Sequence, residues 1–355
     1  MRQIKLSILI LFILFARLSY AQTNQDKAYG LGIKAVQKMD SGQVKESVKL
    51  LEQAIKLDPD NFAYPYEIAY AKYTEKDYKG AIKILEKIEN YKNVTDRLYQ
   101  MLGNSYDNLG KSDKAIETYN RGLKKFPQSG YLHLEMGILH INKNEFTKGL
   151  GYFEKGIYVA PNVSSNYYYA AKIYCSSTEA IWGMIYGEIF MNIERNTKRT
   201  SEISKLLYDT YKKNIAVKSD SSVSVHFSKR SIIGSADVSK LPYNLIYETT
   251  LLLSAAGEKT IDMFALDKIR TNFVTNYFKQ EFNTKYPNVL FNYQNKVLKA
   301  GQLEAYNYWI LMAGNDDEFE NWYLLNKDKY DSFMKWFIDN GMRLDDNNKF
   351  YSDQY

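Results

Sequence analysis

The sequence predicts an all-α fold in which a solenoid of helical hairpins is followed by a C-terminal helical module. Small, aromatic and proline residues recur every 34 residues over 28–163, and apolar residues recur at intervals of three and four along most of the chain. The 355 residues include only 6 Pro and 19 Gly, and 45% of them are hydrophobic. Such a chain can bury a large core, which excludes collagen-like and disordered classes.

Residues 1–21 have the three parts of a secretory signal peptide. Basic Arg2 and Lys5 precede an apolar run from Leu6 to Phe15, and Ser19 and Ala21 place small residues where a signal peptidase cleaves. The apolar run is shorter than the roughly 17 to 25 residues that span a bilayer. We therefore predict cleavage after Ala21, a periplasmic, envelope or secreted location, and no stable membrane insertion of the mature chain.

Four consecutive units share one register over residues 28–163. When the units are numbered from Ala28, Phe62, Asp96 and Gly130, positions 8 and 20 hold small residues. These leave room for two helices to cross closely: Ala35 and Ser47, Ala69 and Ala81, Gly103 and Ala115, Gly137 and Gly149. In three units a proline follows the second helix and prevents its continuation: Pro59, Pro127 and Pro161. We expect the small residues of one unit, such as Gly103 and Ala115, to face each other.

This register resembles the tetratricopeptide repeat (TPR) family. The third unit matches best, with Gly103, Tyr106, Ala115, Tyr119 and Pro127 at the family's positions. The resemblance implies that each unit is a pair of helices and that stacked pairs share a core and form a right-handed superhelix.

The rest of the chain predicts three further parts. Residues 164–215 read as a degenerate fifth repeat and a capping helix, because Tyr167, Ala170 and Ala171 keep the register. Residues 216–241 are serine-rich and alternate at Val223 and Val225, so we expect a linker or a short hairpin. Helical spacing returns over 242–355, which we interpret as the C-terminal helical module.

The charge balance does not favour nucleic acid as a partner. Without the first 21 residues, which contain three basic and no acidic side chains, the chain has 44 basic and 41 acidic side chains. Lysines and glutamates alternate along the helical segments, so no basic stripe forms. We predict a protein or peptide partner, and nothing in the sequence indicates the oligomeric state.

The resemblance also implies where a partner binds, because the family places its concave ligand surface on the first helix of each repeat. Carried over by position, the candidate groove residues are Tyr66, Tyr70, Tyr73, Arg97, Gln100, Asn104, Asp107, Asn108, Asn142, Tyr168 and Lys172. Tyrosine gives a large amphipathic contact area at a small cost in side-chain entropy. We therefore predict a non-enzymatic scaffold that binds protein segments.

The sequence contains no constellation that predicts catalysis, a metal or a cofactor. His133 and His140 occupy repeat positions that pack in the core, and Cys175, the only cysteine, reads as a buried apolar residue. The alternative is that the C-terminal half is a glycan-binding or hydrolytic domain to which the repeats bring a substrate. It depends on whether six aromatic residues line an open pocket or pack shut: Tyr306, Tyr308, Trp309, Trp322, Tyr323 and Trp336.

Overall fold

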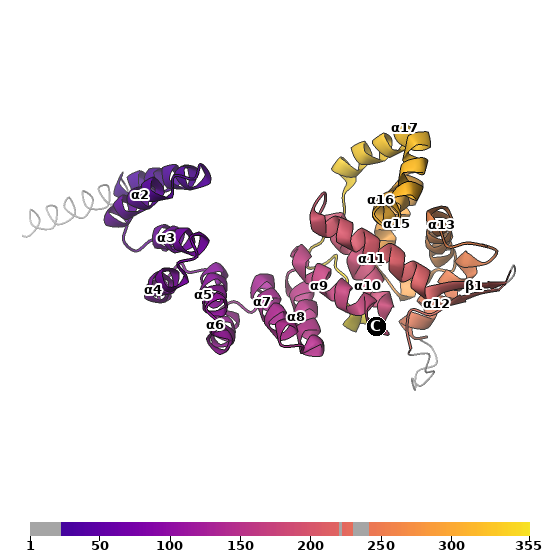
Figure 1. Ribbon diagram of the computed structural model, residues 1–355, viewed down its shortest axis with the longest axis horizontal. Helices are drawn as coiled ribbons and strands as arrows, with labels where there is room; N and C mark the ends of the chain where they lie inside the picture. The colour runs from indigo at the N-terminus through magenta and orange to yellow at the C-terminus, as the bar shows by residue number, and fades with distance from the viewer. Residues whose placement is uncertain (1–22, 220–221, 230–240) are drawn as a thin grey trace, which may run out of the picture. The chain divides into compact units, whose positions relative to one another are not determined.

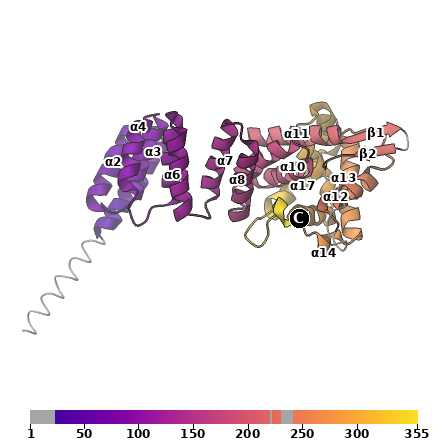
Figure 2. The same ribbon diagram turned by 90° about the horizontal axis from the view of Figure 1, so that it is seen from below.

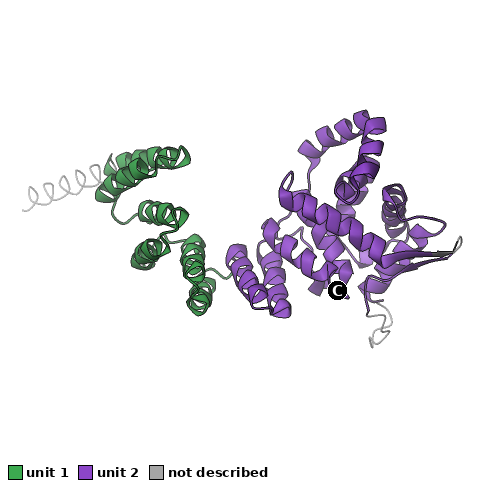
Figure 3. Cartoon of the chain, viewed as in Figure 1, with its two compact units in different colours: residues 1–127 green, residues 128–355 purple. Residues whose placement is uncertain are grey.

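The computed structural model describes residues 23–219, 222–229 and 241–355. The predicted signal peptide and much of the predicted linker lie outside these residues. The described part is helical apart from one two-stranded sheet, so the predicted all-α class is confirmed (Figure 1). None of its helices is both long enough and apolar enough to cross a bilayer. The chain divides into two compact units, residues 1–127 and 128–355 (Figure 3).

The first unit consists of paired helices. Its described helices are 23–40, α2 (Val44–Leu57), α3 (Ala63–Thr74), α4 (Tyr78–Ile88), α5 (Asp96–Asn108) and α6 (Ser112–Lys125). Ala28 and Ala35 of the first helix pack with Leu51 and Ala54 of α2 and with Tyr64 of α3 in one buried cluster. No pair buries its apolar face alone, which is why successive pairs stack.

In each of the four 34-residue repeats, the turn between the two helices has a residue with a left-handed backbone conformation at position 15. Gly42, Lys76, Gly110 and Asn144 occupy this position and have φ values of 78°, 64°, 71° and 60°. Glycine adopts this conformation without a steric penalty, whereas Lys76 does not. The second 34-residue repeat therefore contains a local strain that the first and third repeats avoid.

Replacing Lys76 by Gly should raise the free energy of unfolding by about 0.5 to 1 kcal/mol, because it removes that strain at an exposed position. Urea denaturation of the mature chain measures the change. Lys83→Gly, at an exposed position inside α4, is the control and should lower the stability by about 1 kcal/mol. A loss of stability in Lys76→Gly would contradict the assignment of strain to this turn.

The missing side chain of Gly103 also makes room for a ring, which the expectation that Gly103 faces Ala115 did not include. A Cβ atom on Gly103 would lie 2.1 Å from the ring of Tyr119, so the glycine makes room for the aromatic residue at position 24. Gly137 does the same for Phe153, at 2.4 Å. Large rings and missing side chains therefore interlock within a pair, and the family spacing alone does not reveal this.

The second compact unit, residues 128–355, also contains paired helices, and it adds a module that the repeats do not contain (Figures 1 and 2). Its elements are α7 (Gly130–Asn142), α8 (Phe146–Val159), α9 (Ser164–Cys175), α10 (Ala180–Ile193), α11 (Lys198–Asn214), β1 (Ile215–Ser219), β2 (Ser222–Val225), α12 (Tyr243–Ala255), α13 (Met263–Lys279), α14 (Phe282–Lys285), α15 (Val289–Lys299), α16 (Leu303–Leu311) and α17 (Asp316–Asn340). β1 and β2 pair antiparallel, with Ile215 opposite Val225.

α9 and α10 form a fifth closely packed pair. A Cβ atom on Gly183 of α10 would lie 2.5 Å from Sγ of Cys175 and 3.0 Å from the carbonyl oxygen of Ala171. Gly183 stands at position 20 and Ala171 at position 8 when the register is extended from Ser164. The small residues of the repeat thus persist beyond the point where the sequence pattern becomes hard to follow.

Candidate functional site

The predicted tyrosine stripe lies on α3 with unequal exposure. Tyr70 is 43% exposed, whereas Tyr66 and Tyr73 are half-buried. Tyr66 packs against Phe62 with ring centroids 5.1 Å apart, and burial raises its pKa to about 12. Tyr70 is therefore the most accessible ring of the stripe, and Tyr66 also contributes to packing.

The predicted polar stripe on α5 is connected to this tyrosine stripe. Nδ2 of Asn108 donates a hydrogen bond of 3.4 Å to the hydroxyl of Tyr73, and the charge of Arg97 acts on the hydroxyl of Tyr66. Asn104 accepts a hydrogen bond from Tyr119, and Asp107 accepts one of 2.9 Å from Ser112. Arg97 and Asn108 are exposed, while Gln100, Asn104 and Asp107 are half-buried.

The three predicted groove residues of the second compact unit differ more strongly in exposure. Asn142 is exposed at the end of α7, and Lys172 is exposed on α9. Tyr168 is buried, and its ring lies beneath two cations, Nζ of Lys172 at 4.8 Å and the guanidinium of Arg199 at 5.0 Å from the ring centroid. Tyr168 therefore supports a charged surface and is not itself an exposed anchor.

Lys172 belongs to an open groove of about 740 Å³. Ser176 directly follows α9, and the remaining lining residues are Lys198, Ser201, Glu202, Ile203, Lys205 and Leu206 of α11, with Ala313 and Asp316 beyond α16. We call this cavity the α9–α11 groove. The sequence analysis missed its α11 wall, although the spacing of Lys198, Glu202 and Lys205 marks one polar helix face.

The α9–α11 groove has charges of both signs. Tyr168 donates a 2.5 Å hydrogen bond to Glu202 and accepts one of 3.0 Å from Lys172. The bond from Tyr168 lowers the pKa of Glu202, and the bond to Tyr168 raises the pKa of Lys172. Both side chains are therefore charged at neutral pH. Ile203, Leu206 and Ala313 add apolar residues to the lining of the groove.

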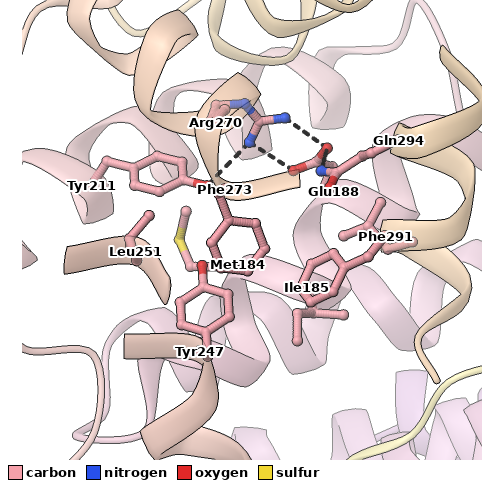
Figure 4. Close-up of a pocket in the computed structure, with 11 residues that line it drawn as sticks. Met184, Ile185, Glu188, Tyr211, Tyr247, Leu251, Arg270, Phe273, Phe291 and Gln294 are labelled. Atoms are coloured by element: carbon pink, nitrogen blue, oxygen red, sulfur yellow. Dashed lines mark hydrogen bonds and ion pairs between the residues drawn. The ribbon is translucent and has the colours of Figure 1, made fainter. Parts of the chain in front are cut away.

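A second group of polar residues, around Glu188 of α10 and Arg270 of α13, is closed to solvent (Figure 4). The two nitrogens of the Arg270 guanidinium lie 2.7 and 2.8 Å from the two carboxylate oxygens of Glu188. Gln294 and Tyr306 also donate to Glu188, at 2.6 and 2.8 Å. The cavity beside them measures about 20 Å³, enough for one water molecule and no substrate.

The aromatic residues of the C-terminal half mostly pack shut. Tyr306, Tyr308, Trp309 and Trp322 are buried, and Tyr308 stacks on Trp322 at 4.1 Å, while Tyr323 and Trp336 are half-buried. The open aromatic pocket that the glycan-binding or hydrolytic alternative requires does not form from these residues.

The histidines and the cysteine that were considered as candidates for catalysis or metal binding are buried or paired with neighbouring side chains. His133 is buried, and Nδ1 of His140 lies 2.6 Å from Glu145. Burial raises the pKa of the Cys175 thiol to about 12, so it is not a thiolate at neutral pH. Among the described residues there is no group of three or more His, Cys, Asp and Glu side chains that could hold a metal ion.

The repeats match known proteins. Two family models of the tetratricopeptide repeat match residues 38–106 and 96–127, and the chain over residues 38–127 belongs to the TPR family. A TPR repeat-containing protein of Methanocaldococcus jannaschii is 27% identical over 110 residues, which are 31% of this chain and 19% of that protein. An anaphase-promoting complex subunit of Saccharomyces cerevisiae is 24% identical over 91 residues, 26% of this chain and 11% of the subunit. The chain thus spans less than a fifth of either relative.

Solved structures are similar to part of the chain. PilF of Pseudomonas aeruginosa has a TM-score of 0.46 and 14% identity, over 54% of this chain and 85% of that chain. YrrB, described as a TPR protein with an unusual peptide-binding site, has a TM-score of 0.36 and 16% identity, over 50% of this chain and 92% of that chain.

Proposed function

We propose that the protein is an exported, non-enzymatic TPR scaffold that binds extended protein segments, and that the α9–α11 groove is a contact surface for them. The α9–α11 groove carries this proposal, because it is open and is lined by apolar residues together with charges of both signs. An extended peptide presents the same mixture, with side chains on two sides and backbone donors and acceptors along its length.

Two further observations support the proposal. Lys172 is at once a groove-lining residue and a concave position of the repeat register, so α9 and α11 extend the surface that the family uses. The export signal supports a location in the periplasm, in the envelope or outside the cell. N-terminal sequencing of secreted material should begin at Gln22, and recovery of Met1 on the exported protein would contradict export by cleavage.

Blocking the α9–α11 groove should abolish peptide binding without affecting the fold. Ser201 is exposed on α11, so Ser201→Trp places a large ring in the groove and removes no packing. Peptides selected from a random library on the mature chain should bind this variant at least about tenfold more weakly by fluorescence anisotropy. Thr275→Trp, at an exposed position of α13 outside the groove, is the matched control and should bind normally.

The tyrosine stripe of the first unit provides the comparison arm. Tyr70→Ala truncates the accessible ring and should leave the helical circular dichroism signal unchanged. If the selected peptides lose affinity for Tyr70→Ala but not for Ser201→Trp, the contact surface lies on α3 and the groove assignment is wrong. If no library peptide is enriched on the mature chain, the proposed function itself is wrong.

A further inference from the structure

The C-terminal module contains another cavity, of about 440 Å³, between α15 and the end of α17. We call it the α15–α17 pocket. Val289, Asn292, Tyr293 and Lys296 form one face of α15, and the opposite side consists of Asp339, Asn340, Gly341, Met342, Arg343 and Asn348. Cavities of roughly 300 to 1,000 Å³ that have a few polar groups commonly hold small molecules.

The α15–α17 pocket has an excess of positive charge. Lys296 and Arg343 line it against one acidic residue, Asp339. Lys296 lies over the ring of Trp336, 5.5 Å from its centroid, and both cations are exposed. The ion pairs found among the described residues include neither of them. Their charges are therefore available to a ligand.

A third cation, Arg195, lies next to Gly341, a residue of the pocket wall. A Cβ atom on Gly341 would be 2.2 Å from a terminal nitrogen of Arg195, so this glycine lets the guanidinium approach the pocket wall. Arg195 lies over the ring of Phe337 at 3.8 Å and donates a 3.3 Å hydrogen bond to the carbonyl oxygen of Asn192. Burial lowers its pKa, and within the described residues no carboxylate pairs with it. A partly buried guanidinium without a counter-ion is costly.

Tyr293 is an independent sign that something is missing from this region. Its hydroxyl is buried and has no hydrogen-bond partner among the described residues. Burial raises its pKa, and the nearby charge of Arg195 opposes this rise. Buried hydroxyl groups nearly always have a partner, so an orphan beside an unpaired arginine points to an absent acceptor.

We propose that the α15–α17 pocket binds a small molecule that carries a carboxylate or phosphate group, with Arg343 and Lys296 lining the anion site and Arg195 adding positive charge from behind Gly341. Guanidinium groups bind both kinds of oxyanion through paired hydrogen bonds. The side chains of Asn292 and Asn340 offer contacts for uncharged polar groups of the same molecule, such as hydroxyls. This site is separate from peptide binding in the α9–α11 groove, and neither proposal depends on the other.

Isothermal titration of the mature chain with three probes tests this proposal. Glucuronate presents a carboxylate, glucose 6-phosphate presents a phosphate, and glucose presents the same hydroxyls without a charge. We expect at least one anion to bind, with an affinity that falls as salt rises, and glucose not to bind. The better anion identifies the preferred group. Binding of neither anion at millimolar concentration, or equal binding of glucose, would overturn the proposal.

Two variants of pocket residues, with one control outside the pocket, locate the binding site. Arg343→Gln should lower the affinity for the better-binding anion about tenfold or more. Lys299→Gln, at an exposed position of α15 outside the pocket, should leave this affinity unchanged. Tyr293→Phe removes only the orphan hydroxyl, so it should leave the melting temperature of the free protein unchanged or higher and weaken the anion several-fold. Unchanged affinity in Arg343→Gln, or a clear fall in the melting temperature of Tyr293→Phe, would contradict the site.

Discussion

Replacing Arg270 by Met should destabilise the protein by about 3 to 5 kcal/mol. Arg270 and Glu188 are only 3% and 4% exposed, and the arginine also donates to Asn307 at 2.8 Å and to Tyr211 at 3.1 Å. Burial alone would lower the pKa of Arg270, but the ion pair with Glu188 raises it above its ordinary value. Removing the guanidinium leaves the Glu188 carboxylate buried without a compensating charge, which is the source of the loss.

Urea denaturation followed by circular dichroism measures this effect. Lys327→Met is the matched control, because it breaks only the solvent-exposed pair with Asp331 and should leave the free energy of unfolding nearly unchanged. The double variant Glu188→Met with Arg270→Met should recover much of the lost stability, since no isolated charge remains. A loss below 1 kcal/mol in Arg270→Met would show that water reaches Glu188.

Replacing Phe350 by Ala should cost about 3 to 5 kcal/mol, although this residue lies beyond the last long helix. Phe350 is fully buried, and its ring centroid lies 6.1 Å from those of Trp182 and Tyr186 and 6.2 Å from that of Tyr243. The backbone N–H of Ser352 donates a 2.8 Å hydrogen bond to the hydroxyl of Tyr186. The C-terminal segment thus completes a core between α10 and α12.

A thermal melt of the mature chain tests this role. Phe146→Ala truncates a phenylalanine that is 50% exposed on α8 and should change the melting temperature little, so it controls for the loss of a ring as such. Phe350→Leu retains most of the apolar volume and should lose less than Phe350→Ala. Equal melting temperatures for Phe350→Ala and the unmodified protein would show that the segment is not part of the core.

The helical class and most helix positions could be predicted from the sequence, because periodicity and capping are local properties. The prolines at 59, 127 and 161 follow the ends of α2, α6 and α8, and glycine at 42 and 110 occupies the left-handed turn. The TPR resemblance also assigned Lys172 to the first helix of a fifth repeat, and Lys172 lies on α9.

The contacts between side chains that are far apart in the sequence could not be predicted, because they depend on how the helices pack. Glu188 and Arg270 are 82 residues apart, and Phe350 packs with aromatic residues more than 100 positions earlier. The α11 wall of the α9–α11 groove and the orphan hydroxyl of Tyr293 likewise depend on which helices become neighbours. Helical periodicity predicts which face of a helix is apolar. The partner of that face depends on which of the other apolar faces in the chain packs against it.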